Sequence, residues 1–136
     1  MTVARDLMQT SPLTVPASAS LPEVQHLLVV AGISGVPVVA EKGAVIGVLS
    51  STDVLRAMAQ ALDEDVDPDE PDDVYERLDA VTAADIATPE VIWVSPDASA
   101  KSVAQLMRDH GIHRVLVGSD DRLEGILTAY DLLRAV

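Results

Sequence analysis

The sequence predicts a mixed α+β (α/β) fold built from two copies of a β-α-β-β-α unit, which pack through their sheets with pseudo-twofold symmetry. Two internal similarities predict this fold. Residues 21–33 align with 100–112 at an offset of 79 residues, and 47–53 align with 125–131 at an offset of 78. A lone unit of roughly 60 residues buries too little surface to be comfortably stable, so we expect the two to form one module.

Each unit is expected to begin with a short extended piece and a helix. Apolar residues at the i, i+3, i+4 and i+7 positions of 24–31 predict a one-faced helix, and 103–110 repeat that spacing with a polar last position. A serine precedes each helix as an N-cap, and a glycine follows it where a left-handed residue is wanted. The expected pieces and caps are 13–15, Ser20 and Gly32 in the first unit, and 91–94, Ser99 and Gly111 in the second.

Two short runs rich in β-branched residues follow each helix. Turn residues separate the two runs, a pattern that predicts a β-hairpin. A second helix is expected after each hairpin. The expected strands are 36–40, 45–49, 114–117 and 123–127, and the expected second helices are 52–62 and 130–136.

The expected domain boundaries place the first unit at 1–62, an acidic linker at 63–80 and the second unit at 81–136. Residues 63–79 hold ten Asp or Glu and one Arg, which is −9 of the net charge of −13. The stretch superficially resembles a calcium loop, but Pro68 stands where that loop needs Gly and Val74 where it needs Glu. We therefore expect a solvated linker, either disordered or with a short helix near 74–78, and no metal site.

Composition excludes several function classes. The strongly acidic balance argues against nucleic-acid binding through a basic face. No apolar run approaches the ~20 residues of a membrane span, and no secretory leader is expected. The chain has no cysteine, which suits a reducing cytoplasm. No nucleophile elbow, phosphate-binding loop or HExxH motif is present, so we expect no enzymatic activity.

One four-residue motif ends both hairpins, as Ser50-x-x-Asp53 and Thr128-x-x-Asp131. The structural interpretation is a capping box at a helix start, which needs no ligand. The functional interpretation uses the same geometry. A helix N-terminus suits a phosphate, and a carboxylate beside it accepts hydrogen bonds from a ribose diol. The two interpretations are compatible.

Four other residues are expected to be mainly structural. Gly47 and Gly125 precede the two motifs, where a glycine allows a bend or close backbone packing. His26 and His110 lie on the two first helices. No His, Asp and Glu cluster with metal-ligand spacing surrounds either histidine.

The units differ most at His113 and Arg114, which replace Ser34 and Gly35 of the first unit. One interpretation is a solvated pair at a strand start. The other is a phosphate clamp, because arginine offers a planar fork of donors and histidine adds another.

Both units resemble a CBS (cystathionine β-synthase) domain. The motifs that carry the resemblance are Asp6-Leu-Met8, Leu13-Thr-Val-Pro16, Gly32-Ile-Ser-Gly-Val-Pro-Val-Val39 and Gly47-Val-Leu-Ser-Ser-Thr-Asp53, and in the second unit Asp85-Ile86, Val94-Ser-Pro96, Gly111-Ile-His-Arg-Val115 and Gly125-Ile-Leu-Thr-Ala-Tyr-Asp131. Each motif is weak alone, but two copies in the same order make the match strong.

The resemblance implies a non-catalytic sensor that binds AMP, ADP or ATP in a cleft between the units, and less often S-adenosylmethionine. In this family the motif Asp holds ribose hydroxyls and the Ser or Thr faces phosphate, so His113 and Arg114 are expected to serve the phosphate of a ligand held by either Asp. The expected nucleotide-binding residues are Thr14, Ile33, Val36, Ser50, Asp53, Ile112, His113, Arg114, Thr128 and Asp131.

Three functions are compared. The leading expectation is an energy-sensing regulatory module that forms a homodimer and contacts an unidentified protein partner. The first alternative is a constitutive dimerisation or interaction module with an empty cleft. A small hydrolase or transferase acting on nucleotides is the third and weakest.

Overall fold

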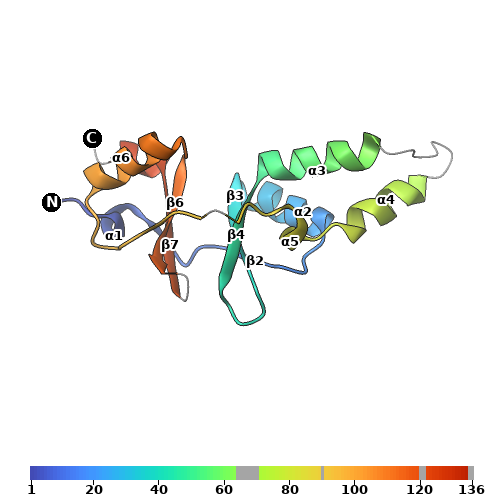
Figure 1. Ribbon diagram of the computed structural model, residues 1–136, viewed down its shortest axis with the longest axis horizontal. Helices are drawn as coiled ribbons and strands as arrows, with labels where there is room; N and C mark the ends of the chain where they lie inside the picture. The colour runs from blue at the N-terminus through green and yellow to red at the C-terminus, as the bar shows by residue number, and fades with distance from the viewer. Residues whose placement is uncertain (64–70, 90, 120–121, 135–136) are drawn as a thin grey trace. The chain divides into compact units, whose positions relative to one another are not determined.

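The computed structural model describes residues 1–63, 71–89, 91–119 and 122–134, arranged as two compact units (Figure 1). The first-repeat unit is Leu13–Glu90. The second-repeat unit combines Met1–Pro12 with Val91–Val136. The mixed α+β class with two sheets is therefore confirmed. The division differs from the expected boundaries, because the first twelve residues pack with the second repeat.

The first-repeat unit has one three-stranded sheet in the order β2-β3-β4. Strand β2 runs parallel to β3, and β3 and β4 form the predicted antiparallel hairpin. Helices α3 and α4 run side by side away from the sheet (Figure 1). The elements are β2 (Val15–Pro16), α2 (Leu21–Ala31), β3 (Gly35–Val39), β4 (Val45–Ser50), α3 (Ser51–Asp63), α4 (Pro71–Ala80) and α5 (Ala83–Ile86).

The second-repeat unit repeats this plan and adds a strand from the N-terminal segment. Its sheet order is β1-β7-β6-β5, with β6 and β7 as the predicted hairpin and β1 antiparallel to β7. The elements are α1 (Ala4–Leu7), β1 (Gln9–Thr10), β5 (Trp93–Val94), α6 (Ala100–His110), β6 (Arg114–Ser119), β7 (Arg122–Thr128) and α7 (Ala129–Leu133).

The predicted helix ends are confirmed in both repeats. Ser20 Oγ accepts a hydrogen bond of 3.4 Å from the Glu23 amide, and Ser99 Oγ accepts one of 3.1 Å from the amide three residues later. Gly32 and Gly111 end α2 and α6 with φ angles of 65° and 63°. These left-handed conformations are the ones that glycine adopts without a Cβ clash.

Each unit buries its own aliphatic core, as expected of a chain that has no Phe. The first core lies between the sheet and helices α2 and α3, and the second contains a residue of α1 together with residues of α6, β6 and β7. The fully buried members include Leu21, Val24, Val36, Val38 and Leu49 in the first unit, and Ala4, Val103, Val117 and Leu127 in the second.

The expected solvated linker at 63–80 is wrong for its C-terminal part. Helix α4 spans Pro71–Ala80, longer than the short helix expected near 74–78, and Leu78 packs against the first core together with Val81. Residues 64–70, which contain five of the ten Asp and Glu of this stretch, lie outside the described residues. Leu78 thus covers part of the first core from within the predicted linker.

Two short segments that the sequence did not predict complete the units in equivalent ways. The Ala4 amide donates to the Ala98 carbonyl at 2.8 Å, and the Ala83 amide donates to the Ala19 carbonyl at the same distance. After each short helix, the chain pairs with the second strand of a hairpin. Strand β1 pairs with β7, and Thr88 pairs with β4. The segment preceding each repeat therefore packs on the other repeat.

Close packing of these segments explains the two strand glycines. A Cβ on Gly47 would lie 2.6 Å from the Thr88 carbonyl oxygen, and one on Gly125 would lie 2.6 Å from Met8 Sδ and 2.9 Å from the Gln9 carbonyl oxygen. Such distances are closer than atoms can approach, so the packing role predicted for both glycines is confirmed. Within the described ranges, no helix is both long enough and apolar enough to cross a membrane.

Candidate functional site

The first candidate site is the junction where β4 ends and α3 begins. The Asp53 carboxylate folds back on Ser50, and its Oδ2 accepts hydrogen bonds of 2.9 Å from both the amide and the hydroxyl of that residue. The Ser50 hydroxyl in turn accepts a hydrogen bond of 3.1 Å from the Asp53 amide. The predicted capping box is therefore present. Asp53 Oδ1 faces Arg56 across 3.6 Å.

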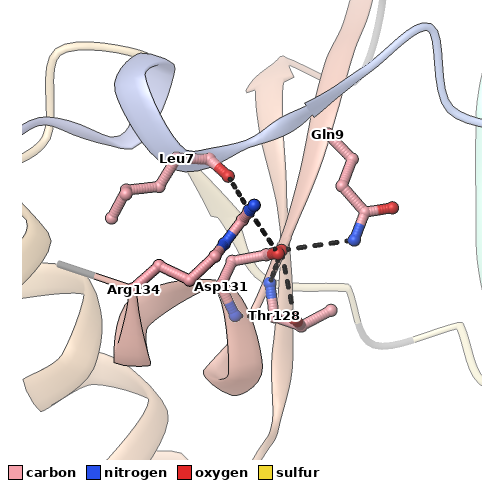
Figure 2. A network of polar contacts seen from close by, with 5 residues as sticks. All are labelled: Leu7, Gln9, Thr128, Asp131 and Arg134. Atoms are coloured by element: carbon pink, nitrogen blue, oxygen red, sulfur yellow. Dashed lines mark hydrogen bonds and ion pairs between the residues drawn. The ribbon is translucent and has the colours of Figure 1, made fainter.

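The second candidate site is the equivalent junction between β7 and α7 (Figure 2). Asp131 Oδ2 accepts hydrogen bonds of 2.9 Å from the Thr128 amide and 3.0 Å from its hydroxyl, and the hydroxyl accepts one of 3.2 Å from the Asp131 amide. The other carboxylate oxygen accepts a hydrogen bond of 2.9 Å from Arg134 Nη2. Gln9 Nε2 reaches Oδ2 at 3.4 Å from the N-terminal segment.

The neighbouring strand brings the other predicted residues to each junction. Arg114 pairs with Thr128 in the hairpin register, and the Ala129 amide donates to the His113 carbonyl at 2.8 Å. Arg114, the first residue of β6, thus lies opposite Thr128, the last residue of β7. In the first repeat the equivalent pair is Gly35 and Ser50, so no cation stands at that strand position.

The remaining predicted residues differ in accessibility. Thr14 is exposed in the segment before β2, while Ile33 and Ile112 are half-buried just after the helix-ending glycines. Val36 is 0% exposed and belongs to the first core, so its side chain is not accessible to a ligand and only its backbone remains for contact. The ten predicted residues fall into two groups, one in each unit.

Arginines three residues after each motif Asp were missed in the sequence analysis. Arg56 and Arg134 form i, i+3 ion pairs with Asp53 and Asp131. An Asp-x-x-Arg spacing in both repeats was the readable signal, because residues three apart on a helix share a face. Gln9 had no such signal, because it lies 122 positions from Asp131.

These geometries define what the junctions can do chemically. Each presents a carboxylate, a hydroxyl and a helix start, a set that can hold sugar hydroxyls and orient an anionic group. Within the part of the chain that the structure describes, no three His, Asp or Glu side chains lie close enough together to hold a metal ion.

Comparison with protein families decides the classification. The profile described as "CBS domain" matches residues 4–60 and 83–136, which is most of the chain. The chain belongs to the CBS domain family. The two matched segments correspond to the two repeats, so the protein contains a CBS domain pair.

Relatives by sequence show that CBS pairs occur within longer proteins. The pair is 28% identical over 130 residues to the uncharacterised protein MJ1225 of Methanocaldococcus jannaschii, covering 96% of this chain and 41% of that protein. It is 27% identical over 135 residues to L-aspartate semialdehyde sulfurtransferase of the same organism, covering 98% of this chain and 23% of that enzyme. The chain thus spans less than half the length of either relative.

Solved structures of other CBS proteins have the same fold. The CBS domain of a CBS domain-containing membrane protein from Sphaerobacter thermophilus matches with a TM-score of 0.82 at 28% identity, covering 100% of this chain and 88% of that one. The CBS domain pair of protein MJ0100, in complex with 5′-methylthioadenosine and S-adenosyl-L-methionine, matches with a TM-score of 0.79 at 26% identity, covering 99% and 95%. Hypoxic response protein I, with two coordinated zinc ions, matches with a TM-score of 0.75 at 26% identity over the full length of both chains.

Proposed function

We propose that this CBS domain pair is a regulatory module that binds an adenosine-type ligand through its strand–helix junctions. The observation that carries the proposal is the duplicated arrangement of hydroxyl, carboxylate and helix start at Ser50 and Asp53 and at Thr128 and Asp131. The MJ0100 pair, which has the same fold at 26% identity, was solved with two adenosine compounds. That similarity supports the ligand class.

The roles of the junction residues follow from their chemistry. A motif carboxylate would accept hydrogen bonds from the two ribose hydroxyls. Arg114 would hold a phosphate, because it starts β6 beside Thr128 and a guanidinium offers paired donors to phosphate oxygens. Arg114 would therefore favour a ligand that carries a phosphate over one that carries a positively charged sulfonium. Among ligands of the class we propose AMP, ADP or ATP, which would make the module a sensor of energy state.

Equilibrium binding tests the proposal. Thermal unfolding is measured with AMP, ADP, ATP, S-adenosyl-L-methionine, 5′-methylthioadenosine and adenosine, with GTP as a control for the base. A ligand that binds only the folded state raises its stability by about 2.7 kcal/mol at a hundredfold excess over Kd. We expect at least one adenosine compound to raise the midpoint and GTP to leave it unchanged. The absence of any shift would favour the interaction-module alternative, and turnover of a nucleotide during long incubation would favour the enzymatic one.

We also propose that the pair forms a homodimer through its second helices. Leu55 on α3 is 68% exposed, and Tyr130 and Leu133 on α7 are 77% and 66% exposed. Exposed apolar side chains grouped on helices often mark interfaces. Light scattering at micromolar concentration checks the mass, and a monomeric mass would contradict the proposal. A cytoplasmic location and a protein partner remain predictions from the sequence.

A further inference from the structure

The two junctions differ in how far their carboxylates are covered. The Asp53 side chain is 15% exposed, whereas that of Asp131 is 4% exposed. Both carboxylates make the same contacts with their own cap residue, Ser50 or Thr128. The polar contacts that distinguish the two carboxylates therefore come from residues outside the capping box.

In the second-repeat unit, α7 and the N-terminal segment meet at Asp131 (Figure 2). Arg134 Nη2 donates to Asp131 Oδ1 at 2.9 Å and also reaches the Leu7 carbonyl oxygen at 3.4 Å. The Gln9 amide approaches the other carboxylate oxygen at 3.4 Å. Arg134 thus links its own helix to the N-terminal segment, and both oxygens of Asp131 are engaged by protein donors.

The equivalent contacts at Asp53 are weaker. The ion pair with Arg56 is longer, at 3.6 Å against 2.9 Å for Arg134, while the two arginine side chains are similarly exposed, at 66% and 60%. Thr88 stands where the repeat offset of 79 residues places Gln9. The threonine side chain is shorter than that of glutamine. Glutamine in one segment and threonine in the other is thus one of the sequence differences between the junctions, alongside the cap residues Thr128 and Ser50.

We infer that Gln9 and Arg134 close the second-repeat junction to a ribose and leave Asp53 as the carboxylate that accepts one. The inference rests on the proposed function and deepens it, because it assigns about one adenosine-type ligand to each chain. A ribose at Asp131 would have to displace a charge-assisted hydrogen bond of 2.9 Å from a buried carboxylate. At Asp53 it would displace only an ion pair of 3.6 Å.

Titration calorimetry with AMP and with S-adenosyl-L-methionine tests the assignment. We expect about one equivalent to bind the wild type, and Asp53→Asn to weaken binding at least about tenfold, as loss of a hydrogen bond to a charged group does. The double variant Gln9→Thr/Arg134→Ala should raise the stoichiometry toward about two, because it gives the second junction the open character of the first. Arg108→Ala, which removes an arginine that is 75% exposed on α6, is the control and should leave the stoichiometry unchanged.

Two results would overturn the inference while leaving the proposed function intact: a wild type that binds both junctions equally, or an Asp53→Asn variant that keeps full affinity. Absence of binding by every variant would instead overturn the proposed function. The closure is then judged without ligand, by hydrogen exchange of the amides of residues 4–10. Faster exchange in Gln9→Thr/Arg134→Ala than in the wild type supports the closure, and unchanged exchange overturns it. Because Asp53→Asn also alters the cap of α3, its unfolding midpoint is measured without ligand to establish that the variant is folded.

Discussion

The Gln9 side-chain amide lies 3.4 Å from the Asp131 carboxylate, although 122 positions separate the two residues. The contact places the N-terminal segment inside the second-repeat unit. The equivalent segment, 81–89, completes the first-repeat unit in the same way, through the pairing of Thr88 with Val48. The second strand of each hairpin therefore pairs with a segment that precedes the other repeat in the chain.

Gly125→Ala should destabilise the second-repeat unit by about 1–3 kcal/mol, the usual cost of overpacking a tight site. The added Cβ would lie 2.6 Å from Met8 Sδ and 2.9 Å from the Gln9 carbonyl oxygen. Chemical denaturation measures the free energy of unfolding. Met8→Ala in the same chain should recover part of the loss, because it removes the side-chain clash but not the backbone one. A single Gly125→Ala variant as stable as the wild type would show that β1 does not approach β7 so closely.

Leu78→Ala should lower the free energy of unfolding by about 1–2 kcal/mol, less than the full cost of truncating a buried leucine because the side chain is only partly buried. Tyr75→Ala, on the same helix and 66% exposed, is the control and should change stability by less than about 0.5 kcal/mol. Equal effects of the two substitutions would mean that α4 does not cover the first core through Leu78.

Asp85→Asn should make stability less dependent on pH. The Thr82 amide donates to Asp85 at 3.0 Å, and this bond, aided by the Thr82 hydroxyl, holds the pKa of Asp85 below its usual 3.8. A lowered pKa contributes stability that is present above the unfolded-state pKa and is lost as the pH falls through the folded-state value. Asp85→Asn should therefore be less stable than the wild type at neutral pH, and the difference should shrink as the pH falls below 3.8 and disappear once it is below the folded-state pKa.

Denaturation across that pH range measures the effect. Glu41→Gln, in an exposed turn, controls for the loss of one negative charge. A stability difference between wild type and Asp85→Asn that stayed constant with pH would show that the Thr82 contact is not maintained in solution.

Arg114→Ala should weaken a phosphorylated adenosine ligand by about 1.5–3 kcal/mol, the range for a hydrogen bond to a charged group, and adenosine much less. The reason is that the guanidinium acts on the phosphate and not on the nucleoside. Calorimetry with AMP and adenosine separates the two. Arg122→Ala, at the other end of the same hairpin opposite Ser119, is the matched control and should change neither affinity. If adenosine lost as much affinity as AMP, Arg114 would not be a phosphate clamp.

Local patterns in the sequence were sufficient to predict the repeats, the main helices, both hairpins and the capping boxes. Helix α2 was predicted between Ser20 and Gly32, and the structure places its ends there. The carboxylates Asp53 and Asp131 were predicted to cap the second helices, and they do. The helices and capping boxes depend on interactions between residues three or four positions apart, and the hairpins on short β-branched runs separated by turn residues, so a single sequence records both.

Tertiary structure alone decided which segment covers which junction. Helix α1 and strand β1 are four and two residues long, too short for a periodic signal, and their backbone partners lie more than about ninety positions away. The packing of Leu78 on the first core was also not predicted, because the acidic composition around it indicated a solvated linker. The sequence determined that two similar junctions exist. The contacts of Gln9 with Asp131 and of Arg134 with the Leu7 carbonyl oxygen distinguish the second junction from the first. They arise only when distant parts of the chain pack together, because no local rule relates residue 9 to residue 131 or residue 7 to residue 134.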